Sequence, residues 1–258
     1  MSKKTSTKLP ELTAWHAESL RLTAFLSANA KIPEPTWWKD LTGKTPDTKN
    51  LRLNKGEQEE IGTFNNGQLI LRIQPIRIDW LFAGVEDQKE GIECPTIGSF
   101  PEALDQFGKL MSTWLNSSSC PSIQRLAFGA VLLQPVTDQR AGYAALADYL
   151  HSVEVDLNST DFMYQINRAR DYSAQVKGLR INRLSKWSVA SMQRIGIEIK
   201  PTSTQGHQIG SVQFFFRLEL DINSNADFPS ELPSQQLARI FQTFTEFAKE
   251  IAAEGDIP

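Results

Sequence analysis

The chain has 258 residues, of which 40% are hydrophobic, and its formal net charge is −3. This composition is sufficient for a packed core and excludes a chain that is disordered throughout. Proteins that coat nucleic acid with their whole surface are much more basic, so any anion-binding surface here must be local.

The cysteines and the first residues of the chain indicate the cellular compartment in which the protein is expected. Cys94 and Cys120 each precede a proline and form no CxxC pair, which argues against a redox motif or a zinc ribbon. We interpret them as free thiols in a reducing cytosol, with one disulfide as the alternative. The basic first residues lack a following apolar segment, and no apolar run approaches the ~20 residues of a membrane-spanning helix. The sequence therefore predicts a soluble, cytoplasmic protein without a membrane partner.

Alternating hydrophobicity predicts a strand near the start of the chain. Its buried face is expected to carry Leu20, Leu22, Ala24 and Leu26. In the proline-rich loop that follows, Trp37 and Trp38 are expected to pack on the core. The alternative is that these two rings are exposed on a partner-binding loop.

A hairpin is expected next. Asn66 and Gly67 suit a tight turn because both residues accept positive φ. The strand over 68–73 then reaches Pro75, which cannot donate to a ladder, so the second arm should bend or divide there. Beyond Pro75, alternation places three apolar side chains on one face, Ile76, Ile78 and Trp80.

A helix should close the first half. Ser99 and Glu102 have the spacing of a capping box. The apolar stripe of this helix is Leu104, Phe107, Leu110, Met111 and Trp114. The polar run NSSSCPS ends it and is the best internal boundary.

The second half repeats this kind of pattern. The run 123–136 is apolar on both faces and predicts a central strand, and Asp138 is expected to cap a helix after it. A later strand should alternate, with Gln213, Phe215, Arg217, Glu219 and Asp221 outward. Its inward residues are Val212, Phe214, Phe216, Leu218, Leu220 and Ile222. The last helix is expected to begin near Ser234 and to bury Leu237, Ile240, Phe241, Phe244, Phe247 and Ile251.

These elements predict an α+β protein with an antiparallel β-sheet, or sheets, and amphipathic helices packed on one face. The expected parts are a β-rich half over 1–116 and an α+β half over 117–258, each closed by a helix. One continuous domain is the alternative, and a duplication of two similar halves is a further hypothesis, although no residue-level repeat is visible.

A basic stretch over 164–194 contrasts with the acidic whole. Its candidate anion-binding or nucleic-acid-binding residues are Arg168, Arg170, Lys177, Arg180, Arg183, Lys186 and Arg194. Two aromatic residues, Tyr172 and Trp187, are candidates for stacking on bases. If the stretch forms adjacent strands, Arg183 shares a face with Leu179 and Ile181, whereas Arg180 and Lys186 lie on the other face. Strand geometry alone therefore does not bring all the cations to one surface.

Several catalytic chemistries lack their residue patterns. No phosphate-binding loop, HExxH or GxSxG motif occurs, and His16, His151 and His207 are isolated from one another. Glu219 and Asp221 on one strand face could hold a metal ion, as in nucleases. We favour ion pairs across the sheet, with partners such as Arg217 and Arg183. The sequence predicts no catalytic residue, no metal site and no cofactor.

Three segments, GLRINRLSKW, RLELDIN and LPSQQLARIFQTFTEFAKEI, resemble an uncharacterised, sporadically distributed bacterial protein family of similar length. That family has Gly-Leu-Arg-Tyr-Ile-Asn-Arg in a strand, and this chain lacks the tyrosine. The family has no established activity, so the resemblance implies no catalytic residue. Its scattered distribution resembles that of mobile bacterial genes, including phage-defence genes.

The expected function is therefore a non-catalytic one. The chain is expected to be a binding, sensor or assembly subunit, an adaptor, in a bacterial intracellular complex such as a phage-defence system. Its partner would be another protein subunit or a second copy of the chain. The alternatives are a nucleic-acid-binding accessory protein that uses the basic strands, and an unrecognised enzyme.

Overall fold

The computed structural model describes residues 9–28, 30, 32, 35–85, 94–200 and 203–258, and in 194–211 it describes the backbone only. The α-helices of this part are α1 (Trp37–Thr42), α2 (Phe100–Leu115), α3 (Gln139–Tyr149) and α4 (Leu237–Glu254). The strands of the first half are β1 (His16–Leu26), β2 (Thr48–Arg52), β3 (Glu57–Phe64), β4 (Gly67–Gln74) and β5 (Arg77–Ala83). Those of the second half are β6 (Ile123–Val136), β7 (Met163–Asn167), β8 (Arg170–Asp171), β9 (Arg180–Lys200) and β10 (Ser203–Ser224).

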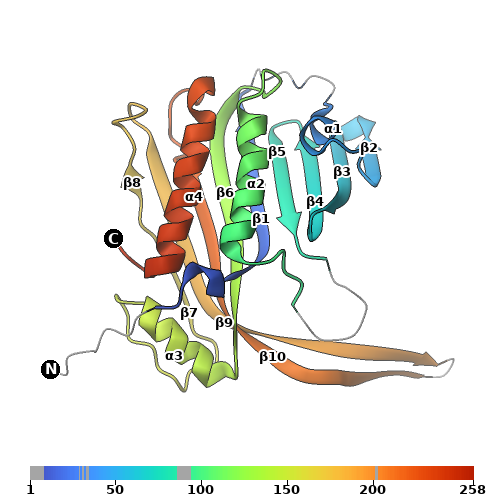
Figure 1. The fold of residues 1–258 in the computed structure, drawn as a ribbon, viewed down its shortest axis with the longest axis vertical. Coiled ribbons are helices and arrows are strands. Elements are labelled where there is room, and N and C mark those ends of the chain that lie inside the picture. The colour runs from blue at the N-terminus through green and yellow to red at the C-terminus, as the bar shows by residue number, and fades with distance from the viewer. Residues whose placement is uncertain (1–8, 29, 31, 33–34, 86–93, 201–202) are drawn as a thin grey trace.

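Within the described residues, the strands form a single ten-stranded sheet in the order β2-β3-β4-β5-β1-β6-β10-β9-β7, and β8 also pairs with β9. All neighbouring strands are antiparallel. Helices α2 and α4 lie side by side across one face of this sheet (Figure 1). The predicted α+β class, with an antiparallel sheet and helices on one face, is confirmed.

The order of elements in the first half recurs in the second. Each half begins with a long strand, continues through a helix and further strands, and ends with a helix that packs on the sheet. The two leading strands, β1 and β6, pair directly with each other, for example at Leu22 and Phe128. The sheet and its hydrophobic core therefore continue across the expected boundary at 116–117.

The core lies between the sheet and the helices. Leu20, Leu22 and Ala24 are fully buried on the helix-facing side of β1, as their alternation predicted. Trp37 and Trp38 are also buried, and the ring centroids of Trp37 and Trp114 are 5.6 Å apart. These contacts agree with the anchoring role expected for the tryptophan pair.

Turn and capping residues agree with expectation only in part. The turn between β3 and β4 lies at Asn65 and Asn66, one residue earlier than expected, because Asn65 has the positive φ and Gly67 already begins β4. At Pro75, where one arm was expected to bend or divide, the chain reverses and β4 pairs with β5. Asp138 accepts a hydrogen bond from the backbone N–H of Ala141 at 2.8 Å and so caps α3. Ser99 donates to the Glu102 carboxylate at 2.8 Å, but its side chain makes no capping bond to the backbone of α2, so the expected capping box is not formed.

Some predicted side-chain positions were wrong. Ile76 is 72% exposed because it lies in the turn between β4 and β5, whereas Ile78 and Trp80 are buried. Val212 is also exposed, and Phe215, expected to face outward, is largely buried. Both lie where β10 leaves its neighbour β6. From that point on, the alternation of apolar and polar residues no longer predicts which side chains are buried.

The last helix also departs from expectation in two places. It begins at Leu237, after a short 3-10 turn over Ser234–Gln236, and Ser234 makes no capping bond. Phe247 is only partly buried, whereas the other expected stripe residues of α4 are buried. Its ring lies at the edge of the core beneath arginine side chains of the opposite strands.

Strands β9 and β10 are 21 and 22 residues long, far beyond the 3–10 residues of most strands. Pairing of β7 with β9 ends at Ser188, and pairing of β6 with β10 ends at Phe214. Beyond these points the two strands pair with each other among the described residues, and Figure 1 shows them leaving the body of the protein. We call this part, 189–200 with 203–213, the β-arm.

Candidate functional site

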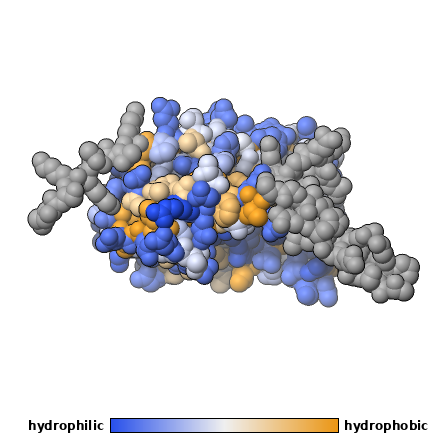
Figure 2. All heavy atoms as spheres, turned by 90° about the horizontal axis from the view of Figure 1, so that it is seen from below, coloured by the Kyte–Doolittle hydropathy of each residue, from blue (hydrophilic) through white to orange (hydrophobic). Residues whose placement is uncertain are grey.

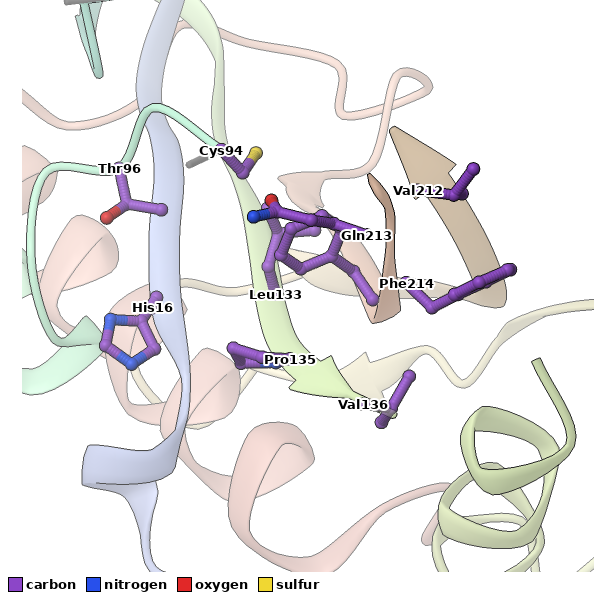
Figure 3. A pocket seen from close by; sticks show the side chains of 10 residues that line it. His16, Cys94, Thr96, Leu133, Pro135, Val136, Val212, Gln213 and Phe214 are labelled. Carbon is purple, nitrogen blue, oxygen red and sulfur yellow. The ribbon is translucent and has the colours of Figure 1, made fainter. Parts of the chain in front are cut away.

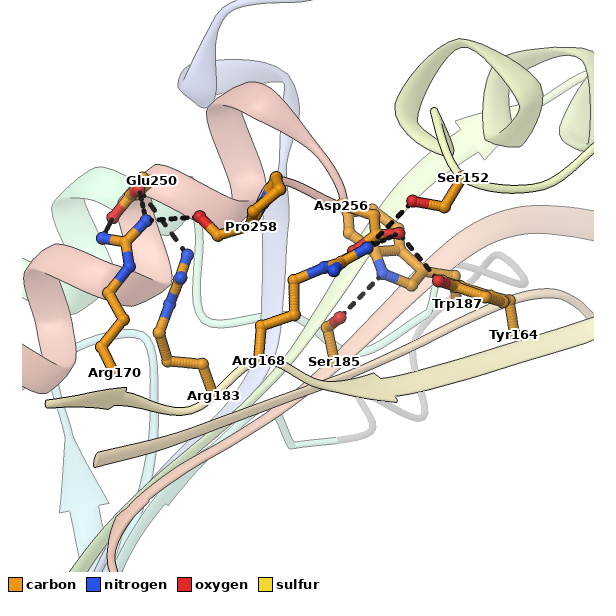
Figure 4. Close-up of polar contacts among 10 residues, drawn as sticks. All are labelled: Ser152, Tyr164, Arg168, Arg170, Arg183, Ser185, Trp187, Glu250, Asp256 and Pro258. Carbon is orange, nitrogen blue, oxygen red and sulfur yellow. Dashed lines mark hydrogen bonds and ion pairs between the residues drawn. The ribbon is translucent and has the colours of Figure 1, made fainter. Parts of the chain in front are cut away.

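The basic stretch does not form one open surface, because Arg168, Arg170 and Arg183 turn toward the C-terminal helix and the segment after it. Arg168 forms two bonds to the Asp256 carboxylate, one of them from Nη2 at 3.0 Å, and also donates to Ser152 (Figure 4). Tyr164 donates to the same carboxylate at 2.8 Å. Asp256 is 3% exposed, so this is a buried ion pair.

The pKa of Asp256 reflects this environment. Burial by itself raises the pKa, but the hydrogen bonds from Arg168, Tyr164 and Ser152 outweigh it and hold the pKa below its usual value. The carboxylate is therefore ionised and acts as a structural anchor for the segment after α4.

Arg170 and Arg183 hold the last turns of α4. Arg170 forms a bidentate ion pair with Glu250 and also donates to the backbone carbonyl of Pro258 at 3.0 Å. Both guanidinium groups lie 5.1 Å from the ring centroid of Phe247. Such cation–π contacts add to the ion pairs and fix the helix against the strands.

Arg183 is the least expected of these residues, since its side chain is only 1% exposed. Its nearest carboxylate oxygen, on Glu250, is 3.6 Å away, and its guanidinium nitrogens make no hydrogen bond within the described part of the chain. Burial lowers the pKa of Arg183, and repulsion from Arg170 lowers it further. The expected pairing of Arg183 with Glu219 or Asp221 was wrong, because Arg183 faces the helices.

The two aromatic residues expected to stack on bases are part of the core. Trp187 is fully buried, and its ring stacks on Phe216 with centroids 5.8 Å apart. Tyr172 is 7% exposed, and its hydroxyl lies 3.3 Å from the hydroxyl of Thr243 on α4. Neither ring offers a face to a nucleic acid in this structure.

The remaining cations are dispersed. Lys177 and Arg180 are exposed near the start of β9, whereas Lys186 lies on the opposite face of the strand from Arg183. Lys186 pairs with Glu219 at 3.0 Å. Arg194 lies in the β-arm, and its side chain is outside the part described. The structure therefore brings Arg168, Arg170 and Arg183 together as a structural cluster and leaves the other candidates apart.

The carboxylates of β10 contact one cation across the sheet, Lys186 on β9, and otherwise residues of β10 itself. Glu219 pairs with Lys186 and with Arg217, the latter at 3.2 Å. Asp221 accepts a hydrogen bond from the Asn223 amide at 2.9 Å. Among the described residues, no group of three or more His, Cys, Asp or Glu side chains is arranged to hold a metal ion.

A candidate binding site lies at the base of the β-arm (Figure 3). It is a cavity of about 520 Å³, and its apolar lining is Leu133, Pro135, Val136, Val212, Phe214 and Phe215. His16, Cys94, Thr96 and Gln213 supply its polar lining. Sequence reasoning missed this cavity, although the apolar residues on both faces of the second half's strands were a usable signal.

The chemistry of this cavity favours binding over catalysis. Burial raises the pKa of Cys94 to about 11, with a further rise from Glu18, so the thiol is protonated at neutral pH. A nucleophilic cysteine requires the opposite shift. Burial likewise raises the pKa of Cys120 to about 12. Both cysteines are free thiols.

No protein-family model matches the chain, and neither a curated protein nor a solved structure is significantly similar to it. In the described residues, no helix is both long and apolar enough to cross a membrane. The class of protein is therefore defined by the fold itself, an antiparallel sheet with helices on one face and a projecting β-arm.

Proposed function

We propose that this chain is a non-catalytic assembly subunit that binds a protein partner through the β-arm and the cavity at its base. The observation that carries this proposal is the length of β9 and β10 beyond their last sheet neighbours, Ser188 and Phe214. A two-stranded hairpin by itself is at best marginally stable in water. A projecting pair of strands therefore gains stability when a partner covers it.

The backbone of the β-arm supports strand pairing with such a partner. Unpaired N–H and C=O groups along an edge strand are a template for another strand. Addition of a partner strand to an open edge is a common mode of peptide and subunit recognition. The partner would be another protein subunit or a second copy of this chain.

The cavity at the base of the β-arm supports the same proposal by offering apolar surface next to that edge. Val212, on its rim, is 37% exposed although it is large and apolar. The lower end of the molecule, seen in Figure 2, mixes hydrophobic with hydrophilic surface. An apolar side chain of the partner that enters the cavity would supply a buried anchor of the kind that dominates interface energies.

The described residues give the nucleic-acid alternative little support. Arg168 and Arg170 are engaged with carboxylates, and Arg183 is buried. Among the candidates whose side chains are described, Lys177 and Arg180 are the exposed cations without an ion pair. The bacterial setting, including a phage-defence system, stays a prediction from the resemblance.

A chain that lacks most of the β-arm, residues 192–213, gives a direct test. Ser191 and Phe214 are opposite each other in the ladder, so an Asn-Gly turn can join them in place of 192–213. We expect the intact chain to purify as a stoichiometric complex, either with itself or with one other protein. The shortened chain should be a monomer with the same thermal stability, as measured by light scattering and thermal unfolding.

Two point variants distinguish specific association through the cavity from nonspecific association through exposed apolar residues. Val212→Ser should weaken association, whereas Leu53→Ser, which removes an 88% exposed apolar residue elsewhere, should leave it unchanged. An intact chain that stays monomeric and purifies alone from its host contradicts the proposal. So does a complex that survives loss of the β-arm.

A further inference from the structure

The face of the sheet that the helices leave uncovered carries a second concave site. Its lining includes charged side chains, unlike that of the apolar cavity. It is a hollow of about 350 Å³ that crosses the seam between β1 and β6, where the two halves of the fold meet. Its polar and small residues are Ser19, Arg21, Gly129, Ala130, Gln165, Lys186, Glu219 and Asp221. Binding sites often lie at such junctions, and this volume is within the range of small-molecule pockets.

Three residues in one row of the ladder define the hollow. Arg21 on β1 and Asp221 on β10 are both register partners of Gly129 on β6. Residues directly opposite each other share a face of the sheet, so the guanidinium and the carboxylate project on either side of a residue without a side chain. Arg21 lies over that residue, because a Cβ atom at position 129 would be 3.5 Å from its Nε and Nη2 atoms.

The charges of Arg21 and Asp221 are not neutralised by ion pairs, whereas those of nearby charged residues are. Glu219, two rows away on the same face, pairs with both Lys186 and Arg217. Within the described part of the chain, neither Arg21 nor Asp221 takes part in an ion pair. The only side-chain hydrogen bond to Asp221 there comes from the Asn223 amide.

We propose that the hollow binds a small zwitterion, with its carboxylate on Arg21 and its ammonium group on Asp221. A guanidinium presents paired donors that fit a carboxylate, and a carboxylate accepts strongly from an ammonium group. A simple anion would be repelled by Asp221 and Glu219, and a simple cation by Arg21 and Lys186. Only a ligand that carries both charges is attracted at both ends.

The strand spacing limits the length of this ligand. Adjacent strands are about 4.8 Å apart, so the Cα atoms of Arg21 and Asp221 are separated by roughly 10 Å across β6. Because the guanidinium already covers Gly129, the gap that a ligand must bridge is roughly one strand spacing. This favours zwitterions of amino-acid size over longer ones. The site does not depend on the β-arm, and would give an assembly subunit the means to sense a metabolite.

A series of zwitterions of increasing length tests the proposal on the intact protein. The probes are glycine, 3-aminopropanoate, 4-aminobutanoate and 6-aminohexanoate, with acetate and methylammonium as single-charge controls, all at one ionic strength. NMR titration of the ¹⁵N-labelled chain should show saturable binding for the shorter zwitterions. The single-charge controls should bind at least about tenfold more weakly, the factor expected when one charged hydrogen-bonded contact is lost.

Variants identify the site. Arg21→Gln and Asp221→Asn should each weaken binding of the best probe by about tenfold or more, and Gly129→Val should abolish it by filling the hollow. Arg72→Gln is the matched control, since Arg72 pairs with Glu59 and does not line the hollow. Thermal unfolding of each variant verifies the fold, and Arg21→Met replaces Arg21→Gln if the latter does not fold.

Three outcomes overturn the proposal. The first is that no zwitterion in the series binds to the wild-type protein. The second is that acetate or methylammonium binds as tightly as the best zwitterion, which would indicate an ordinary anion or cation site. The third is that binding survives in both charge variants, which would place it elsewhere on the molecule.

Discussion

The Nη2 atom of Arg168 lies 3.0 Å from the Oδ2 atom of Asp256, which is 88 residues further along the chain. Because the Asp256 side chain is 1% exposed and that of Arg168 is 24% exposed, this pair is largely shielded from solvent. It joins the segment after α4 to the loop between β7 and β8. A residue expected to bind a partner thus serves to close the fold.

Asp256→Asn should destabilise the protein by about 3 kcal/mol. Loss of one member of a buried pair leaves the other charge uncompensated, which costs about 3–5 kcal/mol, and the partial exposure of Arg168 places the effect at the low end. Chemical denaturation at neutral pH measures this difference. A change below about 0.5 kcal/mol, typical of surface substitutions, would show that the pair is not structural.

The same carboxylate predicts the acid dependence of stability. The pKa of Asp256 is lowered in the folded protein, so its contribution is complete above the unfolded-state value of about 3.9. That contribution is lost as the pH falls through the folded-state pKa. Denaturation at a series of pH values should therefore show a steeper loss of stability below pH of about 4 for wild type than for Asp256→Asn.

Arg183→Met should be neutral or stabilising by about 1–2 kcal/mol, in contrast to Asp256→Asn. Replacement of a buried charge with poor pairing by an apolar side chain of similar volume often stabilises a protein. Glu250 would keep its bidentate partner, Arg170. Arg183→Ala is the matched control, since it also removes the charge but leaves a cavity. A loss of more than about 2 kcal/mol in Arg183→Met would mean that the guanidinium has partners that this geometry does not show.

Phe244→Ala should cost about 3–5 kcal/mol because the ring is fully buried in the main core. Phe247→Ala should cost less, about 1–2 kcal/mol, since its ring is partly buried and packs on the guanidinium groups of Arg170 and Arg183. Equal losses in the two variants, measured by denaturation, would contradict this ranking.

Binding to single-stranded nucleic acid should be barely measurable at about 0.15 M salt. Two exposed cations, Lys177 and Arg180, could together contact about two phosphates, which limits the log–log salt slope to about −1.4. Fluorescence anisotropy with labelled oligonucleotides measures both quantities. Submicromolar binding at that salt, lost in the Lys177→Gln/Arg180→Gln variant while the fold is kept, would restore the nucleic-acid hypothesis.

The two cysteines should react slowly with thiol reagents. Burial raises the pKa of Cys94 to about 11 and that of Cys120 to about 12, so little thiolate is present near pH 8. Because the thiolate is the nucleophile, modification should be at least about tenfold slower than for free cysteine, whose pKa is about 8.5. Rates that match free cysteine in the native protein, and do not rise on unfolding, would show that the thiols are not shielded.

Local patterns in the sequence were sufficient for most secondary structure. The alternation around Leu22, the cap at Asp138 and the break in the strand at Pro75 depend on interactions within a few residues, and each was located correctly, although the break proved to be a full reversal. Ile76 and Val212 were placed wrongly because each lies where a strand ends or leaves its neighbour. Period-two alternation indicates the buried face only along the part of a strand where each face keeps the same surroundings.

The candidate site could not be found in the same way. The sequence by itself determined the strand that carries Arg183 and the face that this residue shares with Ile181. It could not determine that Glu250 and Phe247 would lie opposite that face, because pairing between residues far apart depends on how the helices cover the sheet. The tertiary structure alone turned Arg168, Arg170 and Arg183 toward α4 and the segment after it, where buried charges require partners. It also placed Arg21 and Asp221 on either side of Gly129, since strands from two halves of the chain meet there only after the sheet has formed.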